Sequence, residues 1–460
     1  MNINLNKIVE CKYDLVQDFS EGLAGVMVDD SDDDKWKYFD APRNGKWGYV
    51  DTSGNEVITL EYYDAGCFAD GHAVVGLRGN NYNSMFDNLE RGCIDKKGNL
   101  VIQCKYLYFN NFYDSLCIAY NGKPGNNSGW GCLDVSSEVI VAFGKYDEMG
   151  LSWFSNDERD WYYGTKRFYE GMAIIRSGNK AGFVDNMGKE VISPVYDTAY
   201  HFLHNRAAVG VGKYKNRNWG FVDKTGNEII PCKFEKVKSF SEGLAAVKQN
   251  GKWGFIDVKG NAIVPCKYKS VEYFSDGLSV VWDGKKYGFI DKLGNEIVPC
   301  KYDGVLGSLE FNKNWNGFSE GMSAVYLDGK WGFVDNAGNE RIPCKYVGIG
   351  ADIEKFSGGF AAIRPRPERK WGFLDKTGKE ITGFIYDDVR YFSQGVAAVM
   401  CGDYKNRKWG FIEDSGEYVV PLVFDNAQSF CEGIARVQSG DKWGFIGLPP
   451  VKGFVTQGEK

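Results

Sequence analysis

The sequence predicts an all-β protein in which one small antiparallel sheet is copied about eleven times. Two short steps recur together, and no stretch keeps a helical period of 3.6 residues, so few helices are expected. The first step is a motif that resembles Trp-Gly-Phe and recurs every 34 to 51 residues. Its glycines are Gly48, Gly92, Gly131, Gly182, Gly220, Gly254, Gly288, Gly332, Gly372, Gly410 and Gly444. The second step resembles Phe-Ser-Glu-Gly and ends at Gly22, Gly71, Ser115, Gly171, Asn205, Gly243, Gly277, Gly321, Gly359, Gly395 and Gly433.

One regular copy, residues 240–274, shows how a unit is expected to fold. A short apolar strand leads through a turn into a second strand at 252–257, in which alternate residues face opposite sides. A third strand is expected over 262–265, and a short fourth strand over 266–271. Because apolar side chains point to both faces of these strands, each sheet should be buried between its neighbours.

Three residues of this copy have a predicted backbone role. Gly254 lies inside a strand, which predicts the close approach of a neighbouring backbone or of a Trp ring. Pro265 cannot donate a ladder hydrogen bond, so it should lie at a strand end or a bulge. Asp257 and its counterparts precede a turn glycine and are expected to bond the turn backbone.

Two architectures satisfy this pattern: β-propeller-like rings and, alternatively, an open β superhelix. The segment 6–14 supplies the half-unit that the last copy lacks, and a ring would join these complementary halves. Copy regularity divides the chain into an N-terminal array with irregular and inserted copies (1–210), a C-terminal regular array (211–447) and a tail (448–460).

The repeated phrases GKWGFID, GNEIVPCKYD and FSEGLAAV resemble the WG-containing repeat of bacterial proteins. The resemblance extends from Asn6 to about Gly447 and is interrupted around 77–90, 107–129 and 149–167. It implies a β-rich repeat protein of bacterial origin. It carries over no catalytic residues, and most members of the family have no known biochemical role.

Composition excludes some functional classes. The net charge of −6 argues against a general nucleic-acid binder, which carries a basic face. No run of 18 apolar residues predicts a membrane helix, and the first residues lack a signal-peptide pattern, so a cytoplasmic location is expected. Neighbouring units should stack roughly 10 Å apart, beyond the reach of a disulfide. Reduced thiols are therefore expected at the recurring cysteines Cys11, Cys104, Cys232, Cys266, Cys300 and Cys344.

Candidates for catalysis and for metal binding are few. No nucleophile elbow, Walker loop or zinc-hydrolase motif is present, so we expect no enzyme and no cofactor. His201 and His204 have no accompanying ligand spacing, which argues against a zinc site. The acidic run 29–34 lacks a calcium-loop pattern and is interpreted as a solvated loop, with cation binding as the alternative. Seven of the Trp residues before the recurring glycines form what we call the Trp column: Trp47, Trp219, Trp253, Trp331, Trp371, Trp409 and Trp443. They are interpreted as core packing between units, and a stacking platform for sugars or bases is the alternative.

Extended hairpins at one fixed place in three copies predict a binding edge, because loops at one place of a repeat project from one edge of the array. They contribute a candidate basic rim with aromatic contacts: Lys213, Tyr214, Lys215, Arg217, Arg364, Arg366, Arg369, Tyr404, Lys405 and Arg407. Insertions nearby carry Tyr82, Phe86, Phe311 and Trp315, which fit a partner surface. Solvated hairpin tips without a function are the alternative.

The favoured hypothesis is a non-enzymatic binding scaffold that mediates protein–protein interaction through these loops. The alternative is a receptor for a small anionic ligand, glycan or nucleotide. No membrane partner is expected, and a nucleic-acid partner is disfavoured by the acidic charge.

Overall fold

The structure is a computed structural model, and it describes residues 7–29, 45–79, 89–122, 128–150, 167–213, 216–306, 317–348, 353–403 and 406–448. Within these ranges the chain forms β-strands and loops, without an α-helix and so without a helix that would cross a membrane. The strands make eleven antiparallel sheets in this part of the chain, ten with four strands and one with two. The predicted all-β class and its tandem sheets are therefore confirmed.

Two compact units are described separately. Unit 1 consists of Met1–Asn111 and Phe356–Lys460. Its strands are β1 (Lys7–Tyr13), β2 (Leu15–Val16), β3 (Leu23–Val28), β4 (Lys46–Asp51), β5 (Glu56–Tyr62), β6 (Asp64–Ala65), β7 (His72–Arg78), β8 (Leu89–Asp95), β9 (Leu100–Tyr106), β10 (Tyr108–Phe109), β34 (Phe360–Ile363), β35 (Gly372–Asp375), β36 (Asp388–Val389), β37 (Val396–Cys401), β38 (Lys408–Glu413), β39 (Tyr418–Phe424), β40 (Asn426–Ala427), β41 (Ile434–Ser439) and β42 (Lys442–Gly447).

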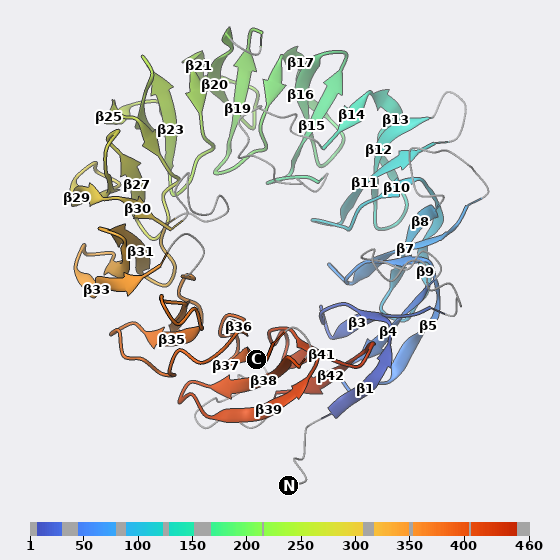
Figure 1. Cartoon of the computed structure of the whole chain (residues 1–460). Coiled ribbons are helices and arrows are strands. Elements are labelled where there is room, and N and C mark those ends of the chain that lie inside the picture. The colour runs from blue at the N-terminus through green and yellow to red at the C-terminus, as the bar shows by residue number, and fades with distance from the viewer. Residues whose placement is uncertain are drawn as a thin grey trace, which may run out of the picture. The chain divides into compact units, whose positions relative to one another are not determined.

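Unit 2 consists of Phe112–Lys355. Its strands are β11 (Leu116–Asn121), β12 (Gly129–Asp134), β13 (Val139–Tyr146), β14 (Glu148–Met149), β15 (Met172–Ser177), β16 (Lys180–Asp185), β17 (Glu190–Tyr196), β18 (Thr198–Ala199), β19 (Arg206–Val211), β20 (Asn218–Asp223), β21 (Glu228–Phe234), β22 (Lys236–Val237), β23 (Leu244–Gln249), β24 (Lys252–Asp257), β25 (Ala262–Tyr268), β26 (Ser270–Val271), β27 (Leu278–Trp282), β28 (Tyr287–Asp291), β29 (Glu296–Tyr302), β30 (Gly304–Val305), β31 (Met322–Leu327), β32 (Lys330–Asp335) and β33 (Glu340–Val347). In unit 2, consecutive strands pair within each sheet, as β14–β17 show (Figure 1).

The predicted fourth strand of each unit has an unexpected place. Residues 262–268 form one strand, β25, and a single residue separates it from β26. However, β26 pairs with β27 and is the first strand of the next sheet. The chain thus passes from one sheet to the next through one residue, Lys269. The division of the chain into two arrays and a tail, at residues 210 and 447, depends on the regularity of the copies and stays a prediction.

The backbone predictions for the regular copy are confirmed. Trp253 pairs with Tyr268 and Phe255 with Val264, so the partner strand bulges opposite Gly254. A Cβ on Gly254 would lie 2.4 Å from the carbonyl oxygen of Val264. Pro265 lies in this bulge, where no ladder donor is required. The Asp257 carboxylate accepts the turn N–H groups of Lys259 and Asn261 at 2.9 and 2.8 Å.

Each sheet is buried on both faces by its neighbours, as predicted. In sheet β22–β25, Ile256 packs in a cluster with the preceding sheet, and Phe255 packs in a cluster with the following one. An edge-to-face aromatic pair lies in each of these contacts, with ring centroids 4.9 Å apart for Phe221 and Phe240 and 4.8 Å apart for Phe255 and Phe274. Such pairs combine large apolar burial with a defined geometry.

Strand β1 completes the last sheet of unit 1. It pairs antiparallel with β42, with Val9 opposite Phe445 and Tyr13 opposite Trp443. The predicted joining of complementary half-units is therefore present in the structure.

The cysteines carry no disulfide. Cys232 shows the recurring arrangement, with its thiol 3.6 Å from the carbonyl oxygen of Val209 in the same sheet. Burial raises the pKa of Cys232 to about 11, so this side chain stays a thiol at neutral pH.

Candidate functional site

The two ends of the sheets carry different loops. The end of each sheet that carries the Phe-Ser-Glu-Gly corners and the Asp turns is called the corner end. The opposite end, which carries the hairpins between the second and third strands, is called the hairpin end. The one-residue connections between sheets also lie there, because each follows the end of a fourth strand. Lys269 marks this connection in the regular copy, and residues 250–251 its hairpin.

Polar groups of the corner end satisfy one another from sheet to sheet. Glu170 accepts the backbone N–H groups of His204 and Asn205, in the next sheet, at 2.7 and 2.8 Å. Lys224 lies 3.4 Å from the same carboxylate. These hydrogen bonds, with Lys224, outweigh burial and lower the pKa of Glu170. Glu242 likewise accepts the N–H of Gly277 at 3.1 Å. The corner end is thus largely engaged in holding the sheets together.

At the hairpin end, an aspartate in the connection clamps two sheets. Asp197 accepts Lys180 Nζ on one oxygen and the N–H of Gly212 on the other, both at 2.7 Å. Lys180 is the main cause that lowers the pKa of Asp197, and the N–H of Gly212 adds to it. Asp303 repeats this arrangement with Lys286 and the N–H of Asp328.

The predicted basic rim is divided between the two units. In unit 2, the β19–β20 hairpin carries Lys213, which is exposed, and Arg217, which is half-buried. In unit 1, the β34–β35 hairpin carries the half-buried Arg364 and the exposed Arg366 and Arg369, and the β37–β38 hairpin carries the exposed Arg407. Outside the described residues lie Tyr214, Lys215, Tyr404 and Lys405. Whether the two groups form one rim stays a prediction.

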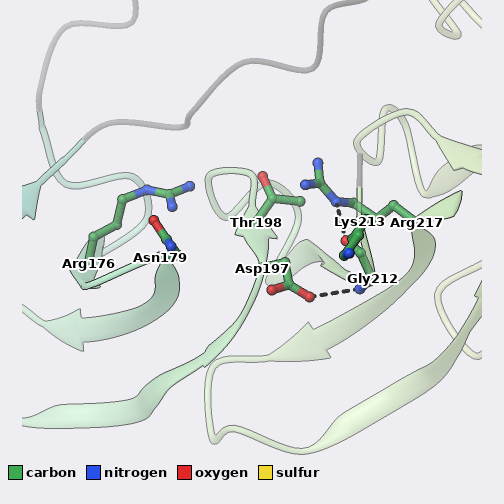
Figure 2. Close-up of a pocket in the computed structure, with 7 residues that line it drawn as sticks. All are labelled: Arg176, Asn179, Asp197, Thr198, Gly212, Lys213 and Arg217. Atoms are coloured by element: carbon green, nitrogen blue, oxygen red, sulfur yellow. Dashed lines mark hydrogen bonds between the residues drawn. The ribbon is translucent and has the colours of Figure 1, made fainter. Parts of the chain in front are cut away.

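Lys213 and Arg217 line a pocket of about 400 Å³ between sheets β14–β17 and β18–β21. Figure 2 shows Arg176 and Asn179 on one side, Lys213 and Arg217 on the other, and Thr198 between them. Asp197 and Gly212 complete the lining, joined by the hydrogen bond described above. The pocket therefore offers three cations, one amide and one hydroxyl around a single carboxylate.

Arg176 is the buried cation of this pocket, with 7% of its surface exposed. Its Nε lies 3.9 Å from a carboxylate oxygen of Glu148. Burial lowers the pKa of Arg176, the charge of Glu148 opposes this shift, and the charge of Arg217 adds to it. Two like charges thus act on each other across the pocket.

Gly210 gives Arg217 its position. A Cβ on this glycine would lie 2.6 Å from Cδ of Arg217 and 2.7 Å from Cγ2 of Thr198. The guanidinium nitrogen Nε of Arg217 donates to the carbonyl oxygen of Gly212 at 3.4 Å. The absent side chain at position 210 therefore allows Arg217 to lie against the strand.

The Trp column is interrupted in the sheet that carries Arg176. Ala181 stands where most copies have Trp, and it lies directly across from Arg176 in the β15–β16 pair. Ala181 faces the same contact between sheets, in a cluster with Phe202 and Val209. In the next contact along the chain, Trp219 fills this place and is 6% exposed. Sequence reasoning missed Arg176 and Asn179, although the missing Trp before Gly182 was a visible signal.

The remaining Trp side chains support the interpretation as core. Trp219, Trp331, Trp371 and Trp409 are buried, and Trp47, Trp253 and Trp443 are partly buried against the clusters. Most of the indole surface is thus covered by the protein itself. A continuous stacking platform for a ligand has little support.

Other predicted residues lie elsewhere. Outside the described residues lie Asp30 to Asp34 of the acidic run and the insertion aromatics Tyr82, Phe86, Phe311 and Trp315. His201 stacks on Tyr169 with centroids 4.0 Å apart, and His204 is exposed at the corner. Among the described residues, no three His, Cys, Asp or Glu side chains are grouped to hold a metal ion.

The comparisons with known proteins identify the repeat. A family model described as the WG containing repeat matches ten segments, residues 1–36, 47–82, 92–123, 182–214, 219–253, 253–287, 287–314, 331–364, 371–404 and 409–443. No curated protein matches the chain.

Several solved structures are similar in fold. The crystal structure of the eukaryotic initiation factor is 10% identical, with a TM-score of 0.38, over 88% of this chain and 96% of that one. Dipeptidyl peptidase 4 of Porphyromonas gingivalis is 10% identical, with a TM-score of 0.37, over 89% of this chain and 60% of that one. The β-propeller domain of the Trilobed protease from Pyrococcus furiosus is 12% identical, with a TM-score of 0.25, over 62% of this chain and 97% of that one.

Proposed function

This chain belongs to the family of WG-containing repeat proteins, and we propose that it is a non-enzymatic binding scaffold that recognises a protein partner through the hairpin end of its sheets. One observation carries the proposal. The corner end uses its acidic side chains to hold successive sheets together, whereas the hairpin end exposes the basic side chains of extended hairpins. A rigid frame with variable loops at one end is typical of repeat proteins that bind other proteins.

The exposed cations indicate the chemistry of the partner. Lys213, Arg366, Arg369 and Arg407 are exposed in a chain whose net charge is −6. An acidic partner surface fits these residues, because complementary charge steers association and sets specificity. Arginine also suits carboxylate groups through paired hydrogen bonds.

A pulldown with charge-reversed variants tests the proposal. The rim variant carries Arg217→Glu, Arg366→Glu and Arg407→Glu. The matched control carries Lys97→Glu, Lys259→Glu and Lys379→Glu, which reverse three exposed charges in the Asp turns at the corner end. We expect a partner that the intact chain and the control retain and that the rim variant loses, confirmed by direct titration of the purified partner. Equal recovery by all three proteins would show that the rim is idle.

The second candidate is a receptor for a small anionic ligand, glycan or nucleotide. The pocket lined by Arg176, Lys213 and Arg217 favours this candidate, because it gathers three cations around a space of ligand size. The burial of the Trp column argues against a glycan platform, since sugars require exposed aromatic faces. Glycan-array binding without a protein partner would favour the glycan over both other ligands.

A location in the bacterial cytoplasm belongs to the same proposal. Support comes from the resemblance of the repeats to bacterial proteins and from the recurring thiols, which suit a reducing compartment. Fractionation of the source cells, followed by detection with an antibody against the chain, tests it. Recovery of the protein in the medium or with membranes would contradict it.

A further inference from the structure

We propose that the pocket between sheets β14–β17 and β18–β21 binds the phosphoryl group of a phosphorylated small molecule. The inference deepens the second candidate function and rests on it. Its site consists of Arg176, Asn179, Thr198, Lys213 and Arg217. The pocket is proposed as a binding site only, and no covalent bond of the ligand is broken there.

The donors converge from both sheets. Arg176 and Asn179 come from β15 and its turn, and Thr198, Lys213 and Arg217 come from the sheet that follows (Figure 2). Guanidinium groups bind phosphate oxygens through two parallel hydrogen bonds, and lysine contributes a point charge. Asn179 and Thr198 add neutral donors. A tetrahedral dianion accepts hydrogen bonds from several directions at once, which a planar carboxylate does less well.

The acidic groups of the pocket leave its cationic character intact. Both oxygens of Asp197 are engaged, one by Lys180 and the other by the N–H of Gly212. A carboxylate oxygen of Glu148 lies 3.9 Å from Nε of Arg176. Lys213 and Arg217 line the same pocket as Arg176, so three lining cations stand against these two carboxylates.

An anion would relieve the repulsion inside this pocket. Arg217 acts on Arg176 across the pocket, and the charge of Arg217 lowers the pKa of Arg176. A bound dianion lies between these two charges and converts their repulsion into two attractions. Because Arg176 is 7% exposed, salt screens its interaction with a bound anion less than it screens surface charges.

The shape of the pocket favours a small molecule over a phosphorylated protein side chain. About 400 Å³ lies between two sheets, and Thr198 at its wall is 2% exposed. Small-molecule sites fall in the range of about 300 to 1,000 Å³. The volume of this pocket exceeds what a single phosphoryl group fills. The rest of the ligand therefore also lies between the sheets.

Calorimetric titration of the full chain with pyrophosphate and with inorganic phosphate tests the inference. We expect saturable binding of pyrophosphate and weaker binding of phosphate. Arg217→Gln should weaken pyrophosphate binding about tenfold or more. Lys248→Gln is the matched control, because Lys248 occupies the strand position of Arg176 in the regular sheet β22–β25, outside the pocket. Equal affinity in Arg217→Gln and the intact chain would overturn the assignment, as would the absence of any binding.

A second variant tests the site without removing a charge. Gly210→Ala places a Cβ 2.6 Å from Cδ of Arg217, so it should displace this side chain and weaken pyrophosphate binding while the circular dichroism stays that of a folded chain. Unchanged binding in the folded variant would place the anion elsewhere. If Gly210→Ala does not fold, Arg217→Gln and Lys213→Gln decide.

A phosphoserine peptide separates the two sources of the phosphoryl group. Tighter binding of this peptide than of pyrophosphate would overturn the small-molecule assignment. The scaffold proposal fails separately, since it depends on partner recovery by the rim variant. If the intact chain binds no anion while partner recovery still depends on the rim, only the pocket is refuted.

Discussion

Two neighbouring contacts in unit 2 share one frame and differ at one end. The contact between sheets β14–β17 and β18–β21 is called the alanine gap, after Ala181. The contact between sheets β18–β21 and β22–β25 is called the tryptophan gap, after Trp219. In their centres, edge-to-face pairs are alike, with centroids 4.9 Å apart for Phe183 and Phe202 and for Phe221 and Phe240. At the hairpin end, a pocket lies in the first contact, where Ala181 takes the Trp position, whereas the buried Trp219 takes that position in the second. The two contacts thus share a central aromatic pair and differ at one recurring position.

The largest expected effect comes from emptying the tryptophan gap. Trp219→Ala removes a side chain that is 6% exposed, and it should destabilise unit 2 by about 3–5 kcal/mol. Urea denaturation followed by circular dichroism measures the loss, with fluorescence as a second probe of cooperativity. Trp253→Ala, at a partly buried position, should cost less. Equal effects at the two positions would contradict the difference in burial.

Alanine at two glycines should separate frame from pocket. In Gly220→Ala, the new Cβ would lie 2.3 Å from the carbonyl oxygen of Ile230, which is backbone, so we expect a loss of about 3 kcal/mol. In Gly210→Ala, the nearest atoms belong to the side chains of Arg217 and Thr198, which can move. This variant should lose less stability but displace Arg217. Thermal melts measure the loss of stability, and pyrophosphate titration measures the displacement of Arg217. A larger loss of stability in Gly210→Ala than in Gly220→Ala would contradict the prediction.

The corner end of the alanine gap should respond to pH. Burial lowers the pKa of His201 from 6.5 to about 4, and the charge of Arg167 adds to this shift. The unfolded chain thus binds the proton first, so stability is constant above pH 6.5 and falls as the pH drops from 6.5 to about 4. We expect a loss of about 2 kcal/mol, less than the full shift implies because the ring is partly exposed.

Melting temperatures between pH 7 and pH 4 measure this loss. His201→Phe keeps a ring to stack on Tyr169 and should remove that part of the pH dependence. His204→Ala, at an exposed position, serves as the control and should leave the pH dependence unchanged. An unaltered profile in His201→Phe would refute the assignment.

The smallest expected effect concerns the clamps at the hairpin end. Asp197→Asn removes the charge that meets Lys180 and should cost about 1 kcal/mol, because the pair is partly exposed. In the tryptophan gap, Glu235 accepts the N–H of Gly251 at 3.2 Å to each oxygen, and no lysine partner is present among the described residues, so Glu235→Gln should cost less. The pKa of Asp197 is lowered, so its contribution is complete above its unfolded pKa and is lost as the pH falls through the folded value. Urea titrations at pH 7 compare the variants, and a costlier Glu235→Gln would contradict the ranking.

The sequence predicted most of the frame, because local chemistry determines it. Gly254, Asp257 and Pro265 were assigned their backbone roles from neighbouring residues alone, and the structure bears these out. The sheet to which β26 belongs was not predictable in this way, since its two residues fit the same alternation in either sheet. Pairing with β27 depends on how the chain turns at one residue, Lys269.

The candidate pocket was only half visible in the sequence. Lys213 and Arg217 stood out in an extended hairpin, but Arg176 is a single charge in an apolar strand. Its importance depends on what lies opposite in the neighbouring sheet, which sequence alone does not reveal. The sequence shows that Ala181 interrupts the Trp column, but the structure is needed to place it directly across from Arg176.

The hydrogen bonds of the corner end give the array a direction. Glu170 and Glu242 each protect the backbone of the sheet that follows them. In these copies the acidic corner side chain accepts hydrogen bonds from the sheet that follows, so the contacts run in one direction along the chain. Loss or duplication of one whole unit rejoins compatible partners, so the copy number of such a protein is free to vary during evolution without redesign of the junctions.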